Sequence, residues 1–219
     1  MSLDNLTEHE KLFFDDGYRL GEQAAAAKSD EKAFLNCVQD AYLAIDGLID
    51  SILAMAQKQD ISVDCKKGCA FCCHQAVYAN SYELHFLGNF INQNFSAEQK
   101  EQAKTLAHEK NKITSGLSDE DVLHYKSPCP LLKENACSAY RARPMACRIY
   151  LSMKLESCVE FYRHPDKPDN FPLLLDFPLT AGRMMNEGFI AALKKADIEV
   201  AEFRLEDGLE GVLTHGAKL

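Results

Sequence analysis

The spacing of its cysteines constrains the fold of this chain more than any other feature of the sequence. Four cysteines lie within residues 65–73, four more lie within residues 129–158, and 55 residues separate the two groups. Thiolates that share a soft metal ion must approach it from several directions, usually about four to each zinc ion. A site built from both groups would clamp the chain between them, so that metal binding becomes part of folding.

The N-terminus and the cysteine count together predict a cytoplasmic metal protein. The first residues, MSLDNLTEHEKLFFDDGYRL, carry charge throughout and contain no uninterrupted apolar core, unlike a secretory signal. Structural disulfides are rare in a reducing compartment, where nine cysteines in one chain indicate metal binding or thiol chemistry. The predicted metal ligands are the eight clustered cysteines, namely Cys65, Cys69, Cys72, Cys73, Cys129, Cys137, Cys147 and Cys158.

The charge balance argues against two classes of partner. The chain has 33 acidic and 24 basic residues, a net charge of −9, which is atypical of general nucleic-acid binders and of basic membrane-surface proteins. No apolar run approaches the length of about 18 residues that a membrane span requires. We therefore expect a metal ion as partner, with no nucleic acid and no membrane. The sequence names no protein partner, substrate or oligomeric state.

Outside the cysteine groups the sequence is typical of helices. An apolar stripe at helical spacing runs through residues 31–57, and Asp30 stands where an N-cap is expected. Cys37 lies on this stripe, which predicts a packing role and no metal binding. Two further pairs have the spacing of capping boxes, Asn80 with Glu83 and Ser96 with Gln99. Other helices are predicted at about residues 7–27, 81–95, 97–113, 119–125 and 180–198, with a helical turn at 208–213.

Strands contribute little to the predicted fold. Residues 199–205, EVAEFRL, are the best candidate, but one strand cannot form a sheet. Residues 171–178, FPLLLDFP, are broken by two prolines and predict an extended packing segment. The predicted fold class is therefore mainly α: a single helical domain over residues 1–219, with cysteine-rich metal-binding loops between the helices.

The two cysteine groups resemble a known family. CKKGCAFCC at 65–73, followed by CPLL and CSAYRARPMACR within 129–148, is similar to the YkgJ-type CxxCxxCC cysteine-cluster family, described as a zinc- or iron-chelating domain. Three residues separate Cys65 from Cys69, where the family name implies two. The resemblance implies metal chelation. Because the family includes relatives of flagellin lysine methylases, the resemblance also leaves open a metalloenzyme that acts on a protein or peptide.

Basic and aromatic residues beside the cysteines predict a supporting shell. Four thiolates on one divalent ion leave a net charge of about −2, which neighbouring cations can offset while donating hydrogen bonds to sulfur. Tyr140 with the Arg143-Pro144 pair is expected to fix the loop that presents Cys147. The predicted supporting residues are Tyr140, Arg143 and Arg148.

The sequence leaves the metal and the chemistry open. Four-thiolate sites suit zinc and also iron–sulfur clusters, so the cofactor is zinc or iron. CKKGCAFC also resembles the cluster motif of radical S-adenosylmethionine enzymes, but a long helical pattern precedes it and no alternation of strands and helices follows. We find no catalytic residues, and the sequence does not decide whether the chain is an enzyme.

The adjacent pair Cys72 and Cys73 predicts more than one metal. Neighbouring side chains point to opposite sides of an extended chain and diverge by about 100° in a helical turn. Two neighbours therefore reach two ions more easily than one, and eight cysteines divide into two sets of four. We predict one multi-metal site in which Cys72 and Cys73 serve different metal centres, or in which one of them bridges two metals.

Overall fold

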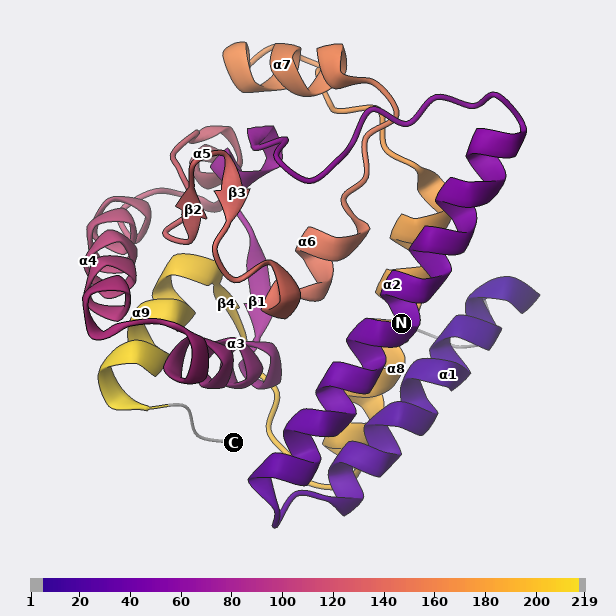
Figure 1. Cartoon of the computed structure of the whole chain (residues 1–219), viewed down its shortest axis with the longest axis vertical. Coiled ribbons are helices and arrows are strands. Elements are labelled where there is room, and N and C mark those ends of the chain that lie inside the picture. Colours follow the sequence, from indigo (N-terminus) through magenta and orange to yellow (C-terminus); the bar gives the residue numbers. More distant parts are fainter. Residues whose placement is uncertain (1–5, 217–219) are drawn as a thin grey trace.

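The computed structural model describes residues 6–216 and is mainly helical over that range (Figure 1). Nine α-helices, two 3₁₀ turns and two two-stranded sheets make up the regular structure of these residues. The predicted mainly α fold class is confirmed. Within the described residues, no helix combines the length and the apolar character needed to cross a membrane.

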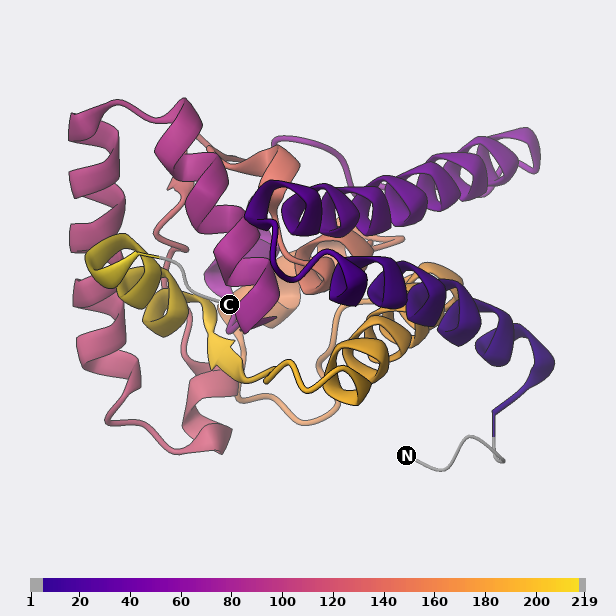
Figure 2. The ribbon, with the colours of Figure 1, turned by 90° about the horizontal axis from the view of Figure 1, so that it is seen from below.

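Three long helices form a bundle on one side of the molecule: α1 (Glu8–Ala26), α2 (Glu31–Lys58) and α8 (Asp176–Lys195) (Figures 1 and 2). The two predicted N-terminal helices are confirmed. Asp30 is the N-cap of α2, and its carboxylate accepts a hydrogen bond from the Ala33 amide at 3.1 Å. The apolar stripe of α2 is buried in a core that it shares with α1 and α8.

Helices α1 and α8 approach each other closely because glycines line their contact. A Cβ atom on Gly17 would overlap the backbone of Met185, and one on Gly188 would overlap the backbone of Phe14. Any side chain at these positions would push the two helix backbones apart, so glycine is required. The spacing of the two helices is thereby fixed.

A second group of helices packs on the opposite side of the molecule and buries its own apolar cluster (Figure 2). Its members are α3 (Ser81–Asn94), α4 (Ala97–Thr114) and α9 (Leu205–His215), with the short α5 (Asp119–His124) following α4. The predicted capping boxes at the starts of α3 and α4 are confirmed. Helix α9 is longer than the predicted turn at 208–213.

One short antiparallel pair joins distant parts of the chain. β1 (Tyr78–Asn80) pairs with β4 (Glu202–Arg204), with Ala79 opposite Phe203. The strand predicted at 199–205 is therefore confirmed over residues 202–204. Its partner was not apparent in the sequence, because three residues are too few to show a strand pattern.

Four short elements carry or flank the cysteines between the bundle and the α3/α4/α9 group: the 3₁₀ turns η2 (Phe71–His74) and η3 (Tyr140–Ala142), and the helices α6 (Met145–Ile149) and α7 (Leu155–Arg163). The sequence predicts loops for the second cysteine group, but Cys147 lies in α6 and Cys158 in α7. Both helices are short, and in the described part of the chain their N-caps supply no side-chain capping bond.

The prediction for residues 171–178 is also corrected. Helix α8 begins at Asp176, within the segment predicted to be extended. Pro178 fits there because the first amides of a helix have no intrahelical acceptor to lose. Just before the helix, Leu174 forms an isolated antiparallel bridge with Ser152, so the extended conformation ends at the start of α8.

Candidate metal centre

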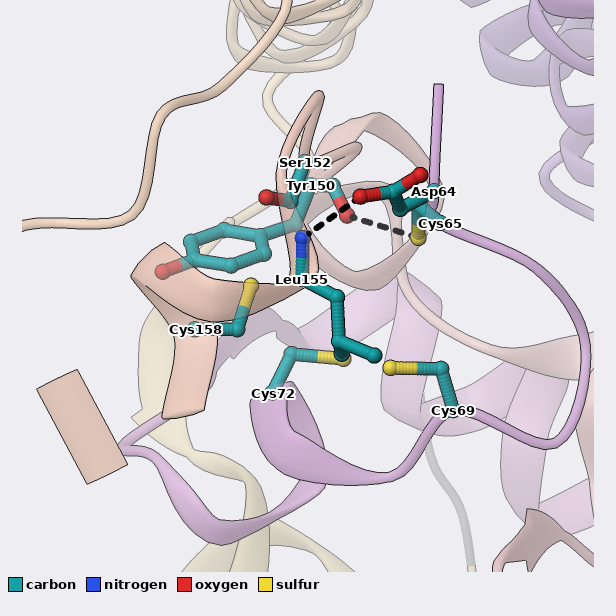
Figure 3. Close-up of a pocket in the computed structure, with 8 residues that line it drawn as sticks. All are labelled: Asp64, Cys65, Cys69, Cys72, Tyr150, Ser152, Leu155 and Cys158. Carbon is teal, nitrogen blue, oxygen red and sulfur yellow. Dashed lines mark hydrogen bonds between the residues drawn. The ribbon is translucent and has the colours of Figure 1, made fainter. Parts of the chain in front are cut away.

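The clustered cysteines line two adjoining pockets. The smaller has a volume of about 10 Å³ and is lined by Cys65, Cys69, Cys72 and Cys158, with Leu155 beside them (Figure 3). That volume is close to the space that one water molecule needs, about 10–15 Å³. In Figure 3 the sulfurs of Cys69 and Cys72 point toward each other. The smaller pocket is therefore a small cavity lined by four thiols.

The larger pocket has a volume of about 920 Å³ and extends from the cysteines toward α2, α8 and β4. It shares three cysteines with the smaller pocket and adds four of its own. The shared residues are Cys65, Cys69 and Cys72, and the added ones are Cys73, Cys129, Cys137 and Cys147. The fold thus brings both cysteine groups to one region of the molecule.

The first cysteine segment is placed by tight turns and by the strand-like residues before α7. The Cys65 amide donates to the Ser152 carbonyl at 3.2 Å, which anchors the segment to the chain leading to Cys158. Gly68 has φ +95°, a conformation that favours glycine, and it turns the backbone directly before Cys69. The 3₁₀ turn η2 then carries Cys72 and Cys73.

The second segment contacts the first through the backbone. The Cys129 amide donates to the Cys73 carbonyl at 2.7 Å, and the Ser127 amide donates to the His74 carbonyl at 3.1 Å. These two bonds join segments that lie 55 residues apart in the sequence. These backbone hydrogen bonds hold Cys129 beside η2 without the help of a metal.

A small hairpin presents Cys137. Strands β2 (Leu132–Lys133) and β3 (Ala136–Cys137) are antiparallel, with Leu132 opposite Cys137. Their two-residue turn, Glu134 and Asn135, has φ +51° and +60°, as a type I′ hairpin turn requires. The hairpin was not predicted, since its strands have two residues each.

Arg148 holds the loop that leads to Cys147. Its side chain is 1% exposed. The guanidinium donates to the carbonyls of Arg143 and Arg141, at 2.9 and 2.5 Å, and to the carboxylate of Asp46 on α2. It also stacks over the Tyr42 ring, 4.0 Å from the centroid. Arg148 therefore fixes the backbone around Cys147 and joins it to the bundle.

Arg143 and Tyr140 form the outer side of the same loop. The Arg143 guanidinium lies 3.9 Å from the centroid of the Tyr140 ring and donates to the Tyr140 carbonyl at 3.0 Å. It also lies 3.6 Å from the carboxylate of Asp46. All three side chains line the larger pocket, so a cation stands beside the thiols.

Burial favours the protonated form of several of the thiols in the pockets. Burial raises the pKa of Cys129 to about 12 and raises that of Cys147 well above its usual value. A hydrogen bond with Cys73, together with burial, raises the pKa of Cys72. Arg143 partly opposes these shifts for Cys72 and Cys147. A metal that binds here must displace protons from sulfur.

The cysteine thiols are donors suited to a soft metal, but they do not stand at the distances of a metal site. Within residues 6–216, no three Cys, His, Asp or Glu side chains stand at metal-ligand spacing around one point. Enclosing a metal would require these thiols to move closer together, and a metal site rarely preforms without its ion. Short turns, a hairpin and short helices carry these cysteines.

Two other candidate residues from the sequence lie outside both pockets. Cys37 packs against the core of the bundle. The Nδ1 atom of His74 lies 3.0 Å from the Ala70 carbonyl oxygen, and the imidazole ring packs on Tyr162 at a centroid distance of 5.1 Å. Both positions are those of packing residues.

Sequence reasoning missed two acidic residues at the site. Asp46 lies beside the apolar stripe of α2, and no local motif connects it with Arg143 or Arg148. The carboxylate of Asp64 accepts a hydrogen bond from the Leu155 amide at 2.9 Å and so supports the start of α7. Asp64 stands next to Cys65, which is the one sequence signal that could have indicated it.

A comparison with protein families agrees with this geometry. Residues 64–167 match the family CxxCxxCC, whose description is "Putative zinc- or iron-chelating domain". We call residues 64–167, which match this family model, the CxxCxxCC domain. The resemblance drawn from the cysteine motifs is thereby confirmed.

The CxxCxxCC domain contains all eight clustered cysteines and the helices α3 to α7. The bundle helices α1, α2 and α8 and the C-terminal α9 lie outside the matched segment. Asp46 on α2 thus supports the CxxCxxCC domain from outside it. No curated protein and no solved structure matches the chain.

Proposed function

We propose that the CxxCxxCC domain chelates zinc or iron through thiolates of both cysteine groups, which converge on one multi-metal site. The observation that carries this proposal is that all eight clustered cysteines line two pockets with three cysteines in common. The proposed ligands are drawn from Cys65, Cys69, Cys72, Cys73, Cys129, Cys137, Cys147 and Cys158.

The charges around the thiols support the proposal. Arg143 lowers the pKa of Cys65, Cys72, Cys137 and Cys147, against the larger effect of burial or hydrogen bonding. A guanidinium that favours the thiolate form also offsets the negative charge of a thiolate–metal site. Lys66 and Lys67 line the same pocket from the loop before η2 and add two further cations. We propose Tyr140, Arg143 and Arg148 as the residues that support the ligands.

Metal analysis of protein purified without oxygen tests the proposal. We expect zinc or iron bound in stoichiometric amounts. Visible charge-transfer bands would assign iron, including an iron–sulfur cluster, and a colourless zinc protein would assign zinc. Protein that binds neither metal after anaerobic reconstitution would contradict the proposal.

The larger pocket favours one alternative, a metalloenzyme that acts on a protein or peptide. Its volume of about 920 Å³ is in the range of ligand sites, about 300–1,000 Å³. Its walls include charged residues from two sides, among them Asp50, Arg183 and Glu202. A catalytic metal keeps an open position, whereas a structural one is closed by protein ligands. Azide added to the cobalt-substituted protein should change its visible spectrum for an open position and leave it unchanged for a closed one.

A further inference from the structure

Lys110 on α4 is a lysine whose side chain lies almost entirely inside the protein. It is 9% exposed, whereas lysine side chains lie mostly at the surface. Its Nζ atom donates a hydrogen bond to the Ser127 carbonyl at 3.3 Å and lies 3.9 Å from the carboxylate of Glu206 on α9. A buried ammonium is costly unless it is paired and hydrogen-bonded, so these two contacts hold the side chain in the interior.

Glu206 is itself held from several sides. Its side chain is 2% exposed, and its carboxylate accepts a hydrogen bond from the Thr114 hydroxyl at 2.8 Å. The Nε atom of Arg204 lies 3.9 Å from the same carboxylate. Glu206 stands in the first turn of α9, where the helix dipole also favours a negative charge. The carboxylate therefore has a fixed place from which it holds the ammonium of Lys110.

The other partner of Lys110, Ser127, belongs to the segment that leads to Cys129. The Ser127 amide donates to the His74 carbonyl at 3.1 Å. Two residues later, the Cys129 amide donates to the Cys73 carbonyl at 2.7 Å. A bond from Lys110 to the Ser127 carbonyl thus restrains the stretch of chain that pairs with η2.

Other polar contacts already join α4 to α9. The Nδ1 atom of His108 lies 2.7 Å from the Glu210 carboxylate. The Asn111 side-chain amide donates to the carboxylates of Asp207 and Glu210, at 3.1 and 3.0 Å. These contacts stay within the two helices, whereas Lys110 also bonds to the cysteine segment. Its position thus links α9 to that segment.

We infer that Lys110, held by Glu206, is a positioning residue of the proposed metal centre. It fixes the Ser127 carbonyl and so keeps Cys129 beside η2, ready for a metal. This inference rests on the proposed function. Because Glu206 lies on α9, a helix outside the matched residues 64–167 contributes to the metal centre through Lys110.

Hydrogen exchange of the metal-free protein, measured by mass spectrometry, tests the positioning by itself. In Lys110→Met, amides in the peptide 126–132 should exchange about tenfold faster, because the segment loses a hydrogen bond from a charged donor. Glu206→Gln should act in the same direction, since a neutral amide does not hold the ammonium by charge. Glu210→Gln is the matched control on the same pair of helices and should leave this peptide unchanged. Equal acceleration in Glu210→Gln, or none in Lys110→Met and Glu206→Gln, would overturn the inference.

Zinc affinity, measured in competition with a chelator, links the positioning to the metal. Lys110→Met should lower the affinity by about 10–100-fold, as the loss of a residue that orients metal ligands does. In a Cys129→Ser background the same substitution should change the affinity less than about twofold, because the ligand that Lys110 positions is then absent. Circular dichroism checks that each variant folds.

Two outcomes separate this inference from the proposed function. An equal loss of affinity in both backgrounds would mean that Lys110 acts through general stability, and would overturn its positioning role while metal binding stands. Wild-type protein that binds neither zinc nor iron would refute the proposed function, and with it the role of Lys110 in metal binding.

Discussion

Arg148, the residue after Cys147, donates a hydrogen bond to Asp46, 102 residues earlier on α2. The same guanidinium holds the carbonyls of Arg141 and Arg143. The ion pair thus joins the CxxCxxCC domain to a helix outside it. Loss of this contact should disturb the proposed metal site and the bundle together.

Replacement of Arg148 by methionine should destabilise the protein by about 3 kcal/mol, the lower end for breaking a buried ion pair, because Asp46 keeps 35% of its side chain exposed. Metal affinity should also fall, since two loop carbonyls lose their donor. Urea unfolding and metal titration measure the two effects. Arg141→Met is the matched control, because among the described residues its guanidinium makes no hydrogen bond or ion pair. Equal effects of both substitutions would contradict the role given to Arg148.

Removal of the metal should lower the melting temperature. A metal that binds only the folded chain at about 1,000 times its dissociation constant adds about 4 kcal/mol, which is about 10 °C for a protein of this size. Calorimetry before and after treatment with a strong chelator makes the comparison. An unchanged melting temperature in protein shown to be metal-free would exclude a clamp between the two cysteine groups.

Replacement of Cys37 by alanine should leave the metal content unchanged. Its side chain packs against the bundle core, outside both pockets, so only packing is lost. We expect a loss of stability of about 1 kcal/mol. Elemental analysis together with urea unfolding checks both statements. Loss of one equivalent of metal would make Cys37 a ligand.

His85 should make the protein less stable in acid. Burial lowers its pKa, and the carboxylate of Glu31, 3.1 Å from Nε2, only partly opposes this. The unfolded chain then takes up a proton near pH 6.5 while the folded protein does not. The stabilising contribution is therefore complete above pH 6.5 and is lost as the pH falls from that value through the lower pKa of His85 in the folded protein.

Unfolding by urea between pH 7.5 and 5.5 measures this effect. His85→Gln should reduce the loss of stability across the range, whereas His164→Gln, at an exposed position, provides the control. Identical pH dependence in the wild type and His85→Gln would show that another group is responsible.

The protein should not act as a radical S-adenosylmethionine enzyme. Its sheets within residues 6–216 are two-stranded, and a long helix, α2, precedes the cysteine motif. No α/β barrel is therefore present in the described chain. Anaerobically reconstituted protein, reduced in the presence of S-adenosylmethionine, should form no 5′-deoxyadenosine. Detection of that product by chromatography would overturn this expectation.

Local signals in the sequence predicted the long helices well. Asp30 and the pairs Asn80 with Glu83 and Ser96 with Gln99 mark helix starts because the capping bonds involve residues three apart. β1 could not be predicted in this way, since its pairing with β4 depends on residues more than 100 positions away. Short helices such as α6 and α7 likewise depend on tertiary packing more than on periodicity.

The candidate site likewise has features that the sequence predicts and features that it does not. Cysteine spacing and the family motif predicted which thiols belong to it, and the match over residues 64–167 confirms the resemblance to the family. The contact of Arg148 with Asp46 was not predictable, because neither residue carries a local signal for the other. The ligand set and the single domain over residues 1–219 stay predictions.

The glycine-lined contact between α1 and α8 has a consequence for biosynthesis. Helix α1 ends at Ala26, whereas α8 begins at Asp176, so the ribosome must add the whole CxxCxxCC domain before α1 can meet its partner. At about 5–20 residues per second, α1 waits roughly 8 to 30 s on the nascent chain. Its glycine face stays exposed to solvent or to a chaperone for that time. The cysteines emerge during the same interval, so metal can reach them before the bundle closes.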